Sequence, residues 1–124
     1  MHRMIKRGEI YYADLDPVVG SEQGGTRPIL VVQNDIGNRF SPTTVIVPIT
    51  SRKQKKATLP THVEISCMGL EHESQALLEQ IKTIDKRRLK DRIGEIEKDQ
   101  MENVERALLI SVGMNKEDVN ANET

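Results

Sequence analysis

The stretch GSEQGGTRPILVVQND, from Gly20 to Asp35, places a loop rich in special residues directly before an apolar run. The segment PILVVQ (Pro28–Gln33) is apolar almost throughout, as in a strand that is buried on both faces. The loop before it contains three glycines, a Ser-Glu-Gln and an Arg-Pro, which is more than a simple connection between strands needs. We therefore expect an interior strand here, preceded by a loop with a function of its own.

Other short segments rich in strand-forming residues flank this run, with turn signals between them. In one of them, Thr43–Thr50, Pro48 indicates a sheet edge or a bulge near the end of the strand. Asp85 is placed to cap a single helical turn at KRRL (residues 86–89). The remaining expected strands are Glu9–Leu15, Thr61–Ser66 (with Val63 and Ile65 on one face), Ala76–Ile84 and Arg92–Glu97.

One helix is expected at the end of the chain, in DQMENVERALLISV (residues 99–112). Met101, Val104, Leu108 and Val112 form an apolar stripe at helical spacing, which predicts a helix packed against the core. Asp99, followed three residues later by Glu102, resembles a capping box. The fold class is therefore mainly β with α: a small, mostly antiparallel barrel with a C-terminal helix. We assign it to residues 1–113, with 114–124 as a polar, flexible tail.

Length and composition agree with a single domain. The chain has 124 residues, enough to close a core without a metal or a disulfide. Its single cysteine, Cys67, cannot form an internal bridge, which favours a reducing compartment. No apolar run approaches the roughly 18 residues of a membrane span, and the start lacks the apolar run of a secretory signal. We expect a cytoplasmic protein.

The charge is unevenly distributed, although its net value is only −1. Residues 1–94 hold 15 Lys and Arg against 11 Asp and Glu, whereas residues 95–124 hold 3 against 8. The basic residues gather at SRKQKK (residues 51–56) and KRRLKDR (residues 86–92). Such clusters either neutralise phosphates or belong to an ordinary solvated surface, and the charge alone does not decide between these alternatives.

Several common chemistries do not fit this sequence. His62, Cys67 and His72 match no usual zinc-finger spacing and lack a fourth ligand, so we expect no metal. GSEQGG is neither a phosphate-binding P-loop nor a dinucleotide fingerprint, so no cofactor is expected either. The aromatic residues are too few for the stacking platforms of common single-strand binders.

Several ordered blocks together resemble the MazF/PemK toxins (mRNA interferases) of bacterial toxin–antitoxin pairs, close to the EndoA-type form of Gram-positive bacteria. The blocks span Met4 to Val112, nearly the whole chain, and their order makes the resemblance specific. They are KRGEIYYADLDPVVGSEQGGTRPILVVQNDIGN, VIVPITS, LPTHVEI, LLEQIKTIDKRRL and GEIEKDQMENVERAL.

The resemblance implies a PemK/CcdB-like fold, a strongly bent antiparallel sheet like an SH3 barrel. It also implies metal-independent, ribosome-independent, sequence-specific cleavage of single-stranded RNA, in which the neighbouring 2′-hydroxyl attacks the phosphorus. The implied assembly is a homodimer with RNA grooves along its interface. A MazE-type antitoxin with an acidic, disordered tail would cover that groove.

The same resemblance implies catalytic roles for Arg27 and Thr50, both of which are present in this chain. Arg27 supplies a forked cation that matches phosphate oxygens, and Thr50 donates to the charged intermediate. Arginine stays protonated in proteins, so we take Glu22 as the candidate general base. The candidate RNA-binding residues are Ser21, Gln23, Asn34, Ser51, Arg52, Lys53 and Gln80, with charge steering from Lys53 and its lysine neighbours.

Two other classes of function remain open at this point. Toxins of the same fold poison DNA gyrase by binding it, without any chemistry, and a non-catalytic RNA-binding module could also keep the fold. The intact Arg27 and Thr50 favour the nuclease, because a binding module needs neither residue.

Overall fold

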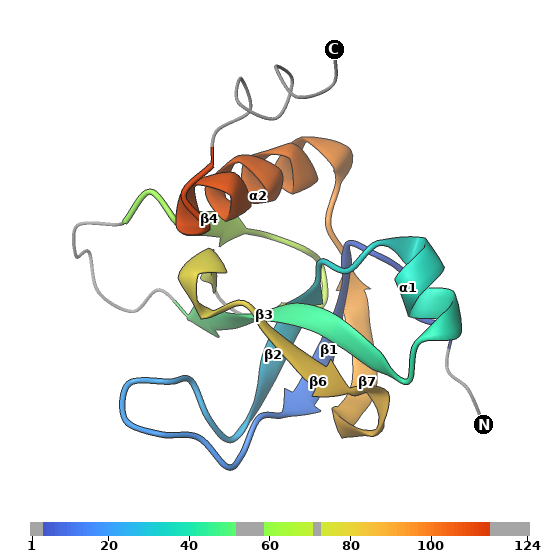
Figure 1. Cartoon of the computed structure of the whole chain (residues 1–124). Helices are drawn as coiled ribbons and strands as arrows, with labels where there is room; N and C mark the ends of the chain where they lie inside the picture. The colour runs from blue at the N-terminus through green and yellow to red at the C-terminus, as the bar shows by residue number, and fades with distance from the viewer. Residues whose placement is uncertain (1–3, 52–58, 71–72, 115–124) are drawn as a thin grey trace.

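The computed structural model describes residues 4–51, 59–70 and 73–114 and is built around a seven-stranded antiparallel sheet (Figure 1). The strand order is β4-β5-β3-β2-β1-β7, and β6 also pairs with β3. The strands are β1 (Glu9–Asp14), β2 (Thr26–Val31), β3 (Thr43–Ser51), β4 (His62–Ile65), β5 (Ser74–Leu77), β6 (Lys82–Asp85) and β7 (Leu89–Glu95). The helical elements are α1 (Asp35–Phe40), α2 (Lys98–Ser111) and the 3-10 turns η1 (Leu78–Gln80) and η2 (Lys86–Arg88).

Strand β3 organises the sheet because it pairs with three other strands. Its residues 43–46 pair with β6, residues 46–48 with β2 and residues 49–51 with β5. Pro48, which has no N–H, lies where the pairing with β2 ends and the pairing with β5 begins. The predicted sheet edge at Pro48 is therefore wrong: β3 lies inside the sheet, and the proline marks a change of partner.

Both faces of the second half of β2 are buried, as the apolar run predicted. Leu30 belongs to an apolar cluster that also contains Ile10, Val47 and Ile49. Its neighbour Ile29 lies in a second cluster, on the other face. Because side chains alternate along a strand, the bent sheet thus divides two packed layers, and β2 is fixed from both sides.

Helix α2 covers the first of these clusters and lies over β4, as Figure 1 shows. Val104 is fully buried, and Met101 and Leu108 pack against the cluster, which confirms most of the predicted stripe. Val112 caps the helix and is 56% exposed. The predicted start at Asp99 is wrong: Glu97 precedes the first turn without a side-chain hydrogen bond, and Asp99 lies inside that turn.

Two local features depart from the sequence-based expectation. The predicted strand Ala76–Ile84 is interrupted by η1, since β5 and β6 pair with opposite ends of the bent β3. The short helix α1 was not predicted; its cap is Asn34, which accepts a hydrogen bond from the backbone of Gly37. The single helical turn after Asp85 is confirmed, with the Asp85 side chain accepting from the backbone of Arg87.

The end of the chain is described only to Met114. Residues 115–124 of the expected tail lie outside the described residues. Within the described ranges, no helix is both long and apolar enough to cross a membrane.

Candidate functional site

Arg27 and Thr50 lie at the same end of the β2–β3 pair. Ile29 on β2 is paired with Pro48 on β3. Arg27 precedes Ile29 by two residues and Thr50 follows Pro48 by two, so in an antiparallel pair both lie beyond it in the same direction. Side chains two residues apart share a face, which places Arg27 and Thr50 together on one side of the sheet.

The guanidinium of Arg27 is held by backbone and not by a carboxylate. Its Nε donates to the carbonyl of Gly24 at 2.9 Å. Within the described residues Arg27 takes part in no ion pair, and its side chain is half-buried. The outer guanidinium nitrogens are therefore free to bind an anion, as the resemblance implied.

The loop from residue 16 to residue 25 connects β1 and β2 (Figure 1). Three hydrogen bonds hold it in place. At its base, the N–H of Leu15 donates to the carbonyl of Gly25 at 3.0 Å. The N–H of Gly25 donates to Asp16 Oδ1 at 2.9 Å. Near its tip, the N–H of Gln23 donates to Gln80 Oε1 at 2.9 Å. The predicted site residues Gln23 and Gln80 are thus brought together, with Gln80 supporting the loop.

Two positions in this loop require glycine for structural reasons. Gly25 has a φ of +74°, a backbone conformation that other residues rarely adopt. A Cβ at Gly24 would lie 2.6 Å from Val18 Cγ2 and 2.8 Å from Asp16 Oδ1. A side chain at Gly24 would therefore require Val18 or Asp16 to shift, and Asp16 is the acceptor that holds the N–H of Gly25 beside the carbonyl bound by Arg27.

Glu22 and Ser21 lie at the exposed tip of the same loop. Glu22 Oε1 accepts a hydrogen bond from the N–H of Val19 at 2.5 Å, and the N–H of Glu22 donates to the carbonyl of Val19. One carboxylate oxygen of Glu22 therefore closes the turn. Only its other oxygen is free to accept a proton in the role suggested for it.

The 3-10 turn η1, whose Gln80 contacts the loop, is itself hydrogen-bonded to residues at the start of β4. Glu79 accepts hydrogen bonds from the hydroxyl of Thr61 at 2.9 Å and pairs with His62 Nε2 at 2.8 Å. Burial by itself would raise the pKa of Glu79, but the hydrogen bonds, led by that from His62, outweigh burial and lower it. Since Gln80 is the next residue, this anchored turn holds the amide that supports Gln23.

Thr50 has two polar neighbours that sequence reasoning did not find. Thr50 is paired with Gln75 on β5, and Gln75 is paired with Glu64 on β4, so all three lie on one face. The hydroxyl of Thr50 has no hydrogen-bond partner among the described residues. Ser51, the next residue, is paired with Ser74. Gln75 and Glu64 meet Thr50 only through strand register, which no local motif reveals.

A family model described as "PemK-like, MazF-like toxin of type II toxin-antitoxin system" matches residues 6–112. The chain belongs to this family. Endoribonuclease EndoA of Bacillus subtilis (strain 168) is 58% identical over 113 residues, which cover 90% of this chain and 97% of EndoA. The resemblance noted from the sequence is thereby confirmed, and the chain is a homologue of EndoA along nearly its whole length.

Solved structures of the MazF family have the same fold. MazF (Form-I) from Deinococcus radiodurans superposes with a TM-score of 0.77 at 26% identity, covering 90% of this chain and 99% of that one. An endoribonuclease in complex with its cognate antitoxin, from a mycobacterial species, gives a TM-score of 0.73 at 28% identity over 88% and 95%. The expected fold class is confirmed, although the sheet is not closed into a full barrel: β4 and β7 remain its ends.

Of the RNA contacts implied by the resemblance, one lies away from the site and two lie outside the described residues. Asn34 follows β2 at the end opposite Arg27, and its side chain is used to cap α1. A six-residue strand is about 20 Å long, so β2 separates the two residues. Arg52 and Lys53 lie outside the described residues.

The second basic cluster of this MazF-family chain serves the fold. Arg87 binds Asp85 at 3.0 Å, and this hydrogen bond lowers the pKa of Asp85. Arg88 donates to the carbonyl of Asp14 at 3.2 Å. Arg92 binds the buried Glu9 at 2.6 Å, which raises the pKa of Arg92. These arginines are held by protein groups, which favours the structural interpretation of this cluster.

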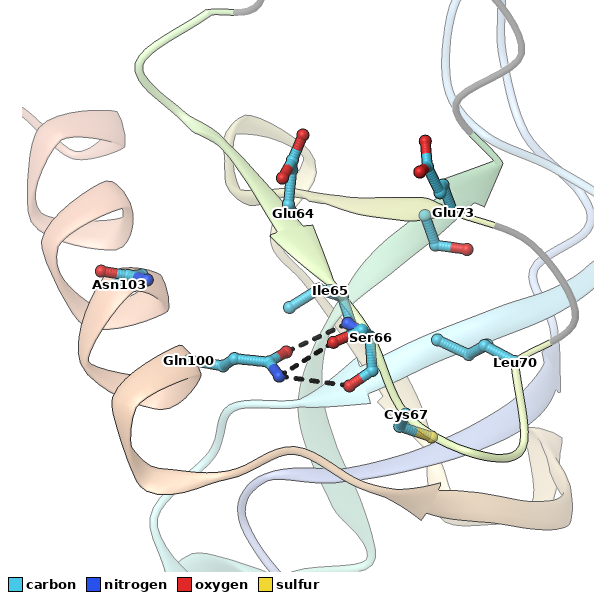
Figure 2. A pocket seen from close by; sticks show the side chains of 9 residues that line it. Glu64, Ile65, Ser66, Cys67, Leu70, Glu73, Gln100 and Asn103 are labelled. Atoms are coloured by element: carbon cyan, nitrogen blue, oxygen red, sulfur yellow. Dashed lines mark hydrogen bonds between the residues drawn. The ribbon is translucent and has the colours of Figure 1, made fainter.

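A pocket of about 550 Å³ lies between β4 and the start of α2, and Glu64 is one of the residues that line it. Figure 2 shows Gln100 bound to Ser66 at its floor, while the carboxylates of Glu64 and Glu73 point away from that contact. Two carboxylates repel phosphate, so this pocket is a poor match for the RNA backbone. Of the three residues considered for zinc, His62 is bound to Glu79 and His72 lies outside the described residues.

Proposed function

We propose that this chain is the toxin of a type II toxin–antitoxin system and a sequence-specific endoribonuclease that cleaves single-stranded mRNA independently of metal and ribosome. The observation that carries the proposal is the placement of Arg27 and Thr50 on one face beside the anchored loop, both with free donors. Membership of the MazF family and homology to EndoA support it. Cleavage of mRNA in the cytoplasm would stop translation, and with it the growth of the cell that makes the toxin.

In the proposed reaction the 2′-oxygen of one nucleotide attacks the adjacent phosphorus, and the bond from phosphorus to the 5′-oxygen breaks. The products are a 2′,3′-cyclic phosphate and a 5′-hydroxyl. Arg27 stabilises the charge that builds up on the non-bridging oxygens. Thr50 donates a hydrogen bond to the same oxygens, a contribution of about 2.7–4 kcal/mol if it acts like other oxyanion donors.

Two protons must move in this reaction. The 2′-hydroxyl loses one, for which the free oxygen of Glu22 is the proposed acceptor. The leaving 5′-oxygen gains one, for which the guanidinium of Arg27 is the proposed donor. Arg27 enters the reaction protonated, so it cannot be the base. The leaving 5′-alkoxide is a stronger base than neutral guanidine and takes a proton from Arg27, which regains one from solvent after the reaction.

We further propose that the toxin is a homodimer, with its interface at the β4 edge of the sheet and the end of α2. Three large apolar side chains on this side are about half exposed: Leu59 (54%), Ile110 (50%) and Val112 (56%). A pocket of about 360 Å³ between β4 and α2 is lined in part by Ile110. An open strand edge beside apolar side chains favours association.

The proposed protein partner is a MazE-type antitoxin. A solved mycobacterial relative is an endoribonuclease in complex with its cognate antitoxin, which supports this assignment. An acidic tail would bind the cations that bind RNA, so inhibition would be competition for the site. Its ordering costs entropy, which the large surface it covers offsets.

The test is incubation of the purified chain with a long single-stranded RNA in excess EDTA, next to Arg27→Ala and Glu22→Gln. We expect cuts at a few defined sites with 2′,3′-cyclic phosphate ends, lost with Arg27→Ala and strongly slowed with Glu22→Gln. Near-normal cleavage by Glu22→Gln would show that Glu22 is not the base. Intact RNA under conditions where the wild type is folded would refute the nuclease and make gyrase binding the alternative to test.

A further inference from the structure

A row of polar side chains crosses the sheet from β2 to β4 on the face of the candidate site. Strand pairing places Thr50 opposite Gln75 and Gln75 opposite Glu64, with Arg27 on the adjoining strand. The neighbouring row faces the opposite way: Val63, Ala76 and Ile49 are paired in the same order and are buried in the core. The alternation shows that the polar row forms a continuous strip outside the core.

Gln75 is the unusual member of this row. Among the side chains that the structure describes, its Oε1 is the one buried oxygen or nitrogen without a hydrogen-bond partner. Leaving a buried acceptor unpaired lowers the stability of a folded protein, and such groups are rare in native structures. An apolar residue in this strand position would avoid that penalty, so the glutamine needs an explanation outside the fold.

We propose that Gln75 is a substrate-binding residue of this site: when RNA binds, its partly exposed side chain turns the amide out of the buried position, and Oε1 accepts a hydrogen bond from the nucleotide next to the cleaved phosphate. The proposal rests on the proposed function. A phosphodiester carries only acceptors, so it binds the donors of Arg27 and Thr50 and cannot bind Gln75 Oε1. The group that Gln75 accepts from is therefore a 2′-hydroxyl or an N–H on a base edge.

The charges along the row agree with phosphate binding at Arg27 and Thr50 and with sugar or base binding at Gln75. The cation of Arg27 lies at one end of the row, and the carboxylate of Glu64 lies on the strand at the other. Phosphate is attracted to the first and repelled by the second. A strand of RNA across the row would thus place phosphate over Arg27 and Thr50, and its sugar or base over Gln75.

The decisive variant is Gln75→Met, which keeps the length of the side chain and removes its polar atoms. We expect KM for a cleaved RNA to rise about tenfold, the loss of one hydrogen bond, with kcat near the wild-type value. The melting temperature should stay equal or rise, because the unpaired acceptor is gone. Gln75→Val, a good strand former, serves as a second variant if the methionine disturbs folding.

Gln100→Met is the matched control, the same chemical change at an amide that has partners. Gln100 accepts from the N–H of Ser66 at 3.1 Å and donates to its carbonyl at 3.2 Å (Figure 2). We expect a lower melting temperature and an unchanged KM, the reverse of Gln75→Met. If KM is unchanged in both Gln75 variants, or if both melt clearly below the wild type, Gln75 serves the fold and the proposal is overturned.

Modified substrates identify the donor on the RNA. Short RNAs containing the mapped cleavage site would carry either a 2′-deoxy sugar at the nucleotide on the 3′ side of the cut, whose 2′-hydroxyl is not the nucleophile, or a base lacking one N–H donor at a nucleotide next to the cut. The modification that removes the partner of Gln75 should raise KM for the wild type but not for Gln75→Met. If no modification shows this coupling, Gln75 makes no such contact.

The same experiment separates this inference from the proposed function. If wild type and variants all leave RNA intact, the nuclease itself is refuted and the inference with it. If the wild type cleaves and Gln75→Met cleaves with the same KM, only the role of Gln75 is refuted.

Discussion

The two ends of strand β2 carry polar groups of very different kinds. At the end that leads to α1, Asn38 is 2% exposed, and the oxygen and nitrogen of its side-chain amide both make their hydrogen bonds within the protein. Its Oδ1 accepts from Gln33 and from Thr44, and its Nδ2 donates to the carbonyl of Gln33 and to Asp35. At this end the polar side chains satisfy one another.

At the other end, several polar side-chain groups lack a partner among the described residues. Among the described residues, the hydroxyl of Thr50 and the Oε1 of Gln75 have no hydrogen bond, and Arg27 has no ion pair. Here the hydrogen bonds that exist hold the loop in place and do not use the hydroxyl of Thr50, the Oε1 of Gln75 or the outer nitrogens of Arg27. The difference indicates that one end is built for stability and the other for a ligand, which is how active sites depart from local rules.

The largest expected effect that tests this comparison is that of Thr50→Val. Valine has the same shape, so removing a hydroxyl without a partner should change the free energy of unfolding by less than about 0.5 kcal/mol. Cleavage should fall by a factor of about 10²–10³, as for other oxyanion donors. The measurement is the single-turnover cleavage rate, with Thr50→Ser as the variant that keeps the hydroxyl. A valine variant that cleaves at the wild-type rate would remove Thr50 from the mechanism.

At the opposite end, Asn38→Ala should show the reverse pattern. It leaves the buried hydroxyl of Thr44 without its acceptor and removes one of the two acceptors of the Gln33 side-chain amide, a loss of about 2–4 kcal/mol in the free energy of unfolding. Cleavage per folded molecule should be unchanged. The measurement is urea unfolding at one fixed protein concentration, since association affects apparent stability. A loss of activity without a loss of stability would contradict the division between the two ends.

A smaller effect is expected for Gln80→Ala, at the contact that joins the loop to η1. The base of the loop keeps its own hydrogen bonds, so the fold should survive while the tip moves. We expect the cleavage rate to fall about tenfold, in line with the loss of one positioning contact.

A readout in the free protein separates support of the loop from contact with RNA. Hydrogen exchange of the Gln23 amide should become faster in Gln80→Ala even without substrate, because its acceptor is lost. Unchanged protection of this amide would mean that Gln80 acts only on RNA.

Sequence alone predicted most of this architecture, for reasons that differ between elements. The run Pro28–Gln33 predicted a strand buried on both faces, because alternation and burial are local signals. Arg27 and Thr50 were found because the family resemblance placed them. Gln75 was not found, since its position beside Thr50 depends on the register of β3 with β5, which pairs residues far apart in the chain. The resemblance alone implies an RNA contact for Asn34, and its capping role becomes visible only once α1 is known.

The smallest expected effect is a pH dependence at the satisfied end, through Asp35. The backbone N–H of Arg7 and the side chain of Asn38 donate to its carboxylate and lower its pKa below the usual 3.8. A lowered pKa stabilises the fold above the unfolded value, and this contribution is lost as the pH falls through the folded one. Asp35→Asn removes the charge but keeps an acceptor. The difference in unfolding free energy between wild type and Asp35→Asn should therefore be present at pH 6 and shrink below about pH 4. Urea unfolding at both pH values measures it. Because Asp35 is exposed, the difference should be small, and a difference independent of pH would show that its charge does not contribute to the α1 end.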